Sequence, residues 1–126
     1  MEEKFERFKI VAVDKNNNIV SISKVIHVST KGSKKKANPT KVAVKKAILT
    51  KAKSLKKGST LALKATAKKA KKTKVVKHTA IRYESSNTKV ATVTSKGKVK
   101  AIKKGTAKIY CYAQNGKVKI VAVRVK

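Results

Sequence analysis

Alternation of apolar and polar residues between positions 81 and 113 constrains the fold of this chain more than any other feature. Short runs in which every second residue is apolar are separated there by the turn sequences Ser-Ser-Asn at 85–87, Ser-Lys-Gly-Lys at 95–98 and Lys-Lys-Gly at 103–105. The Asn-Gly pair at 115–116 adds a hairpin of the type I′ kind. Because side chains on a β-strand point alternately to its two faces, such runs predict strands with one buried face. Short strands with turns at this spacing are typical of an antiparallel β-sandwich, so we predict an all-β fold.

The same alternation continues on both sides of this stretch. Strands are predicted at 60–67, after a glycine turn, and at 118–125. A shorter strand at 41–44 either continues through 47–49 or changes sheets there. The Lys-rich residues 68–78 predict a loop or a ragged edge strand, because their apolar residues do not form a helical face. About seven strands result, and the side chains expected to point inward are Leu61, Leu63, Ala65, Ala67, Ile81, Tyr83, Ala91, Val93, Val99, Ala101, Ala107, Ile109, Cys111, Ala113, Val121, Val123 and Val125.

Four features occur in order along the central stretch. They are Tyr83 followed by Ser85-Ser86-Asn87, then Val90-Ala91-Thr92-Val93, then Gly97 with Val99, and finally Gly105-Thr106-Ala107. Together they resemble the group 2 bacterial immunoglobulin-like domain, with Tyr83 where that family usually carries Trp. The resemblance covers roughly residues 39–126 and implies an immunoglobulin-like β-sandwich. It also implies a non-catalytic structural or adhesion module of a bacterial cell-surface or secreted multidomain protein, with an extracellular or cell-envelope location and neighbouring domains of a longer chain as partners.

The first 30 residues predict a β-hairpin. Strands are expected at 8–13 and 19–29, around the turn sequence Asp-Lys-Asn-Asn-Asn at 14–18, in which asparagine tolerates a positive φ. The pair resembles the last two strands of a fibronectin type III domain. We therefore predict that residues 1–30 are a partial module of that kind, which either docks on the sandwich or frays. The Lys/Gly/Ser-rich residues 31–38 predict a linker to the sandwich.

No apolar run in the chain is long enough to predict a membrane span, and the first residues do not have the apolar core of a signal peptide. We therefore expect any export signal to lie outside this sequence. Cys111 is the only cysteine, so the predicted sandwich contains no internal disulfide.

The net charge of +30 leaves two interpretations open. In the first, the lysines fill the outward positions of strands and turns, where they keep sheet edges soluble. In the second, they form a surface that binds a polyanion such as wall teichoic acid, an anionic glycan or nucleic acid, since Lys and Arg that neutralise phosphates supply sequence-independent affinity. Nucleic acid is the less favoured partner because Arg7, Arg82 and Arg124 are the only arginines and stacking aromatics are scarce.

Candidate catalytic groups are few. Glu84 is the only acidic residue after Asp14, so neither a paired-carboxylate mechanism nor a Ca²⁺ site of several carboxylates can be assembled in the sandwich. His27, His78 and Cys111 do not have the clustered partners that a zinc site or a nucleophilic site needs. We therefore expect no enzyme activity, no catalytic or metal-binding residue and no cofactor.

Tyr110, Tyr112 and Lys108 are the candidate ligand contacts. They lie on the outward phase of one predicted strand, where two aromatic rings among lysines could stack on a sugar ring of a cell-wall polymer or host glycan, or meet a partner protein. The alternative is that the two rings cover exposed sheet or contact the neighbouring hairpin.

Overall fold

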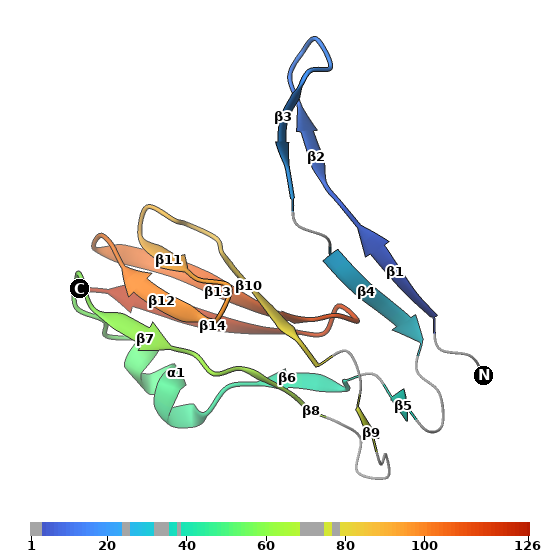
Figure 1. Ribbon diagram of the computed structural model, residues 1–126. Coiled ribbons are helices and arrows are strands. Elements are labelled where there is room, and N and C mark those ends of the chain that lie inside the picture. Colours follow the sequence, from blue (N-terminus) through green and yellow to red (C-terminus); the bar gives the residue numbers. More distant parts are fainter. Residues whose placement is uncertain (1–3, 24–25, 32–35, 38, 69–74, 77–78) are drawn as a thin grey trace.

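The computed structural model of the chain describes residues 4–23, 26–31, 36–37, 39–68, 75–76 and 79–126 (Figure 1). Within these residues strands predominate, together with the short helix α1 (Lys46–Ala52). The strands are β1 (Lys4–Phe8), β2 (Val11–Val13), β3 (Ile19–Ile22), β4 (Ile26–Lys31), β5 (Lys36–Ala37), β6 (Lys41–Ala43), β7 (Thr60–Ala62), β8 (Thr66–Lys68), β9 (Val75–Val76), β10 (Ile81–Ser85), β11 (Ala91–Val93), β12 (Lys98–Ala101), β13 (Gly105–Ala113) and β14 (Val118–Val125).

The predicted N-terminal hairpin is confirmed. β1 pairs with β4 and β2 with β3, both antiparallel. At the turn, Oδ1 of Asp14 accepts hydrogen bonds from the backbone N–H groups of Asn18 (3.0 Å) and Asn16 (2.8 Å), which lower the pKa of Asp14. Asn17 takes the positive φ, at 63°. Figure 1 shows the hairpin, in blue, extending away from the other strands, and the side chains of residues 7–22 are all exposed, so the hairpin does not dock through them.

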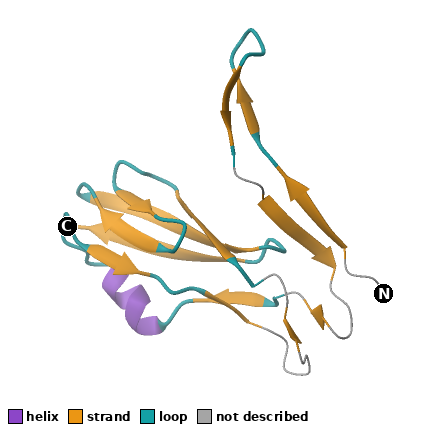
Figure 2. Ribbon diagram, viewed as in Figure 1, coloured by secondary structure: helices purple, strands orange, loops and turns teal. Residues whose placement is uncertain are grey.

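The remaining strands confirm the all-β sandwich. One three-stranded sheet has the order β10-β13-β14 and a second has the order β11-β12-β7 (Figure 2). β6 pairs with β8, and the two-residue strands β5 and β9 run parallel to each other, so the predicted linker ends in a short strand. Within residues 39–126 the described strands are β6 to β14, which are nine, or eight if β7 and β8 are counted as one interrupted strand, against about seven predicted.

The core lies between these sheets. Leu63 and Ile109 are fully buried in one cluster of apolar side chains, and Tyr83 of β10 and Val93 of β11 are partly buried and pack against this cluster. Burial alternates along β12, β13 and β14, so every second side chain on these strands faces the interior. Many small side chains together therefore fill the core. The buried apolar side chains are Val42, Val44, Ala52, Leu55, Leu63, Val90, Ala91, Val99, Ala101, Ala107, Ile109, Cys111, Ala113, Val121, Val123 and Val125.

The prediction that 47–49 continue a strand is wrong, because these residues lie in α1. One helical turn brings Ile48, Leu49 and Ala52 to the same side, and Ala52 is completely buried against the sandwich while the other two are partly buried. The helix is only seven residues long, so its packing on the core stabilises it more than its intrinsic helix propensity does.

The predicted strand at 60–67 is interrupted instead of continuous. Lys64 adopts a φ of 47°, which ends β7 and lets β8 leave for another partner strand. β7 pairs with β12 and β8 pairs with β6, so the chain changes sheets at this point. The inward phase is kept, since Leu63 is buried and Lys64 is exposed. Of the predicted loop at 68–78, residues 69–74 and 77–78 lie outside the described part of the chain.

The turn between β13 and β14 is not of type I′. A type I′ turn needs positive φ at both central residues, whereas here only Gly116 has it, at 86°. The N–H of Gly116 donates to the carbonyl of Ala113 (3.1 Å), and the N–H of Ala113 donates to the carbonyl of Lys117 (2.8 Å), which closes a three-residue loop. The side-chain amide of Asn115 donates to the carbonyl of Pro39 (2.7 Å), so this residue ties the turn to the start of the sandwich.

Candidate functional site

The outer face of the β10-β13-β14 sheet carries the predicted ligand contacts. Alternate residues of β13 and β14 fill the core, so the remaining ones point away from it. This outer face is unusually apolar for so charged a chain, because Val118 and Ile120 are 43% and 48% exposed. The outward residues of the three strands are Arg82, Glu84, Thr106, Lys108, Tyr110, Tyr112, Val118, Ile120, Ala122 and Arg124.

Tyr110 and Tyr112 stack on each other. Their ring centroids lie 5.9 Å apart and their planes differ by 18°. Arg82, which is opposite Tyr112 on the neighbouring strand, places its guanidinium carbon 5.5 Å from the centroid of the Tyr112 ring, within the range of a cation–π contact. Tyr112 thus contacts Arg82 of the neighbouring strand as well as Tyr110 of its own strand.

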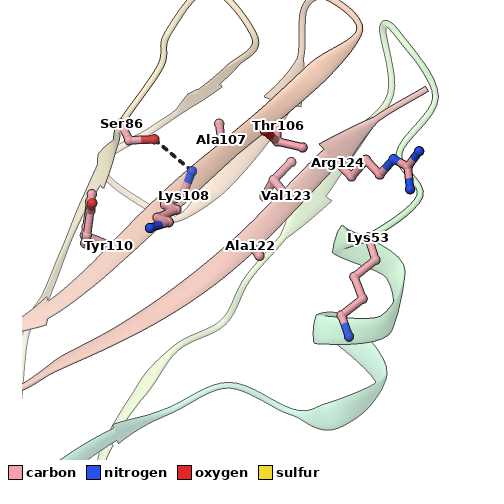
Figure 3. A pocket seen from close by; sticks show the side chains of 9 residues that line it. All are labelled: Lys53, Ser86, Thr106, Ala107, Lys108, Tyr110, Ala122, Val123 and Arg124. Carbon is pink, nitrogen blue, oxygen red and sulfur yellow. Dashed lines mark hydrogen bonds between the residues drawn. The ribbon is translucent and has the colours of Figure 1, made fainter.

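A pocket of about 540 Å³ lies over β13 and β14 (Figure 3). Its floor is formed by the small outward side chain of Ala122 and by the strands at Ala107 and Val123, whose own side chains point into the core, and none of its lining residues is acidic. Figure 3 shows Lys53 and Arg124 on one side and Lys108 with Tyr110 on the other. The complete lining is Lys53, Ser86, Thr106, Ala107, Lys108, Tyr110, Ala122, Val123 and Arg124.

Backbone hydrogen bonds fix the walls of this pocket. The N–H of Ser86 donates to the carbonyl of Lys108 (2.9 Å), and the hydroxyl of Ser86 accepts from the N–H of Lys108 (2.8 Å). On the other side, Leu55 forms a parallel bridge with Val125, and its N–H donates to the carbonyl of Arg124 (2.9 Å). This bridge holds the end of α1, and with it Lys53, beside the edge of the sheet.

Contacts among the four ordered sequence features explain why they occur together. Ser85 donates its hydroxyl hydrogen to the carbonyl of Ala91 (2.6 Å), which ties β10 to β11. Gly97 lies beneath the Tyr83 ring, because a Cβ added to Gly97 would come within 2.5 Å of Cζ of that ring. The hydroxyl of Tyr83 accepts a hydrogen bond from the N–H of Ala65 (3.2 Å), so the buried phenol has a partner, and burial raises its pKa.

Comparison with known families agrees with these contacts. Residues 40–123 match the family described as bacterial Ig-like domain (group 2). This chain belongs to that family. The predicted resemblance is therefore confirmed for the sandwich, while the match does not extend to the hairpin. Among curated proteins, none matches the chain.

Membership of the bacterial Ig-like family indicates the class of protein in which such a domain typically occurs. Domains of this kind are generally non-catalytic modules and typically occur in extracellular or surface proteins. The described residues contain no group of three or more His, Cys, Asp and Glu side chains placed to hold a metal ion. No helix in the described ranges is long and apolar enough to cross a bilayer.

Cys111 lies in the interior of this bacterial Ig-like domain. Its side chain is fully buried on the inner face of β13, as its phase in the strand predicts. Burial raises the pKa of the thiol to about 11, because the thiolate would lose its hydration. The thiolate is the reactive form, so Cys111 acts as a small apolar core residue and not as a nucleophile at neutral pH.

The structure brings only part of the predicted contact set together. Lys108 and Tyr110 line the pocket and Tyr112 does not. The sequence interpretation missed Arg124, Thr106, Ser86 and Lys53. Arg124 and Thr106 are opposite each other in the β13-β14 register, which the outward phase of the last strand could have indicated, whereas Lys53 depends on a helix that was predicted as strand.

Proposed function

We propose that this bacterial Ig-like domain is a non-catalytic structural or adhesion module of a cell-surface or secreted multidomain protein. The observation that carries the proposal is that the chain enters and leaves the sandwich at opposite ends. The carbonyl of Pro39 accepts a hydrogen bond from the side chain of Asn115, in the turn that precedes β14, and Lys126 follows the far end of the same strand. Eight residues of strand separate the two ends by roughly 25 Å, since each residue adds about 3.3 Å.

This arrangement suits a spacer, because modules whose two ends face away from each other extend a chain when they are joined in series. The family supports a surface location, since its members typically occur in extracellular or surface proteins. The test is to raise antibodies against residues 39–126 and to label intact cells of the bacterium that produces the protein. Labelling of intact cells, or recovery from the medium, is expected. Labelling only after permeabilisation, with a cytosolic protein as control, would contradict the proposal.

We further propose that residues 1–30 belong to a neighbouring module similar to fibronectin type III, with residues 31–38 as the linker. The hairpin exposes large apolar side chains that further strands of such a module would cover. Hydrogen exchange on the purified chain should show faster exchange in β2 and β3 than in β13. Equal protection would indicate that the hairpin is stable by itself. The exposed side chains are Phe8, Ile10, Val11, Val13, Ile19, Val20 and Ile22.

A second candidate function is polyanion binding by the lysine-rich sandwich. The observation that favours it is the pocket on the outer face, where Lys53, Lys108 and Arg124 gather without a lining carboxylate. Wall teichoic acid and anionic glycans fit this better than nucleic acid, because Tyr110 is the one aromatic residue that lines the pocket and a single ring is a poor platform for successive bases. Retention on immobilised teichoic acid should fall steeply with salt, whereas weak and equal retention on every polyanion would reduce the effect to bulk charge.

A further inference from the structure

We propose that the pocket over β13 and β14 binds a short stretch of an acidic glycan, with a pyranose ring on Tyr110 and the anionic group of the glycan between Lys108, Arg124 and Lys53. This inference rests on the second candidate function and makes it specific. It names one place on a broadly basic surface and one chemical class of ligand. That class is a sugar ring whose substituent or neighbour carries a carboxylate or a phosphate.

The shape of the site favours a small ligand. A volume of about 540 Å³ falls within the range of roughly 300 to 1,000 Å³ that is usual for small-molecule pockets. The strands β13 and β14 form its floor, where Ala122 is the one outward apolar side chain and those of Ala107 and Val123 point into the core. This floor accepts a flat ring, and its backbone is held rigid by the β13-β14 ladder.

Tyr110 supplies the surface on which the sugar would stack. Along β13, Tyr112 lies on one side of Tyr110 and Lys108 on the other, and only Lys108 and Tyr110 line the pocket. The contact with Tyr112 fixes the orientation of the Tyr110 ring, so little side-chain entropy remains to be lost on binding. The C–H groups on one face of a pyranose are apolar and weakly positive, and they match the negative face of an aromatic ring.

Charge decides between a neutral and an acidic sugar. Lys53, which follows α1, and Arg124 of β14 line one side of the pocket, Lys108 of β13 lines the other, and no acidic side chain lines it (Figure 3). Arg124 presents a planar guanidinium that can donate two parallel hydrogen bonds to a carboxylate or a phosphate. The hydroxyls of Ser86 and Thr106 are available to sugar hydroxyls at the same rim. A neutral glycan would use the ring and the hydroxyls and leave three cations without a partner.

The experiment titrates the full chain with three ligands by calorimetry: a uronic acid oligosaccharide, a glycosylated glycerol-phosphate oligomer, and a neutral oligosaccharide of the same length as the first. We expect at least one acidic ligand to bind at least about tenfold more tightly than the neutral one. Comparison of the two acidic arms identifies carboxylate or phosphate as the preferred anion. Equal affinity for acidic and neutral ligands would overturn the role given to the three cations.

Matched variants place the site. Tyr110→Ala and Arg124→Gln should each weaken acidic-glycan binding by about tenfold, while Lys96→Gln, which removes one positive charge outside the pocket as Arg124→Gln does within it, should change binding less than about twofold. Thermal unfolding of each variant checks that it folds. Equal losses from Arg124→Gln and Lys96→Gln would overturn the pocket and leave the second candidate function standing as a diffuse charge effect. If neither acidic ligand binds and immobilised teichoic acid does not retain the chain, then the glycan-binding pocket and the second candidate function are both wrong.

Discussion

The hairpin and the sandwich contain the same kinds of strand and turn, but their apolar side chains differ in burial. Both contain antiparallel strands joined by three-residue loops in which the third residue has a positive φ, namely Asn17 in the hairpin and Gly97 and Gly116 in the sandwich. In the hairpin every side chain from 7 to 22 is exposed, whereas in the sandwich alternate side chains of three strands are buried. Local sequence therefore determines strand and turn, but a second layer is needed before an apolar face is buried.

Their patterns also differ. In β12, β13 and β14 burial alternates from residue to residue, even where the four consecutive residues from Ile120 to Val123 of β14 are all apolar. In β3 the adjacent residues Ile19 and Val20 are both apolar and both exposed, at 64% and 68%. A two-stranded ribbon has no interior in which to place either face. Stability should thus reside almost wholly in the sandwich.

The largest contrast is expected from two equivalent truncations. Ile109→Ala removes a fully buried side chain from the core and should lower the free energy of unfolding by about 2 to 5 kcal/mol. Ile19→Ala, the same chemical change in the hairpin, should stay within about 0.5 kcal/mol, because Ile19 is mostly exposed. Denaturant unfolding followed by circular dichroism measures both. Similar losses would show that the hairpin and the sandwich unfold as one unit.

A second contrast lies between two loops of the sandwich. Gly97→Ala should cost about 3 kcal/mol, because a Cβ there would come within 2.5 Å of the Tyr83 ring at a φ of 82°. Gly116→Ala should cost about 1 kcal/mol, since its φ is 86° but the space around it is open. Thermal unfolding compares the two. A Gly97→Ala chain as stable as Gly116→Ala would mean that Tyr83 moves aside without cost.

A smaller effect should appear only in alkali. The thiol of Cys111 has a pKa of about 11 in the folded chain against 9.0 for an ordinary cysteine. Between these values the unfolded thiol ionises while the folded one keeps its proton, so the folded state binds more protons and the free energy of unfolding falls as pH rises. Relative to Cys111→Ala, the original chain should lose about 2 kcal/mol between pH 8 and pH 11. Parallel pH profiles for the two chains would contradict this.

The sequence predicted which face of a strand each side chain occupies. It did not predict which elements pair or pack with each other. Alternation placed Leu63, Tyr83, Val93 and Ile109 in a common interior, because a period of two fixes the face of each side chain. The segment around Ile48 was predicted as strand because three apolar residues fit either a short strand or a helical turn, and only packing on the core decides.

The candidate site was predictable to the same degree. Lys108 and Tyr110 follow from the outward phase of a single strand. Arg124 requires the register between β13 and β14, and Lys53 requires the position of α1 beside the sheet edge. Both are tertiary facts that no local pattern contains.

The bond between Asn115 and Pro39 has a mechanical consequence. It fastens the start of the sandwich to one end of the β13-β14 ladder, while the chain leaves from the other end. Tension applied through the backbone would then run along β14, at right angles to the hydrogen bonds that join it to β13. Because the turn that carries Asn115 leads directly into β14, this load would pass along the covalent backbone of that strand, and the single hydrogen bond between Asn115 and Pro39 would be the first contact to break.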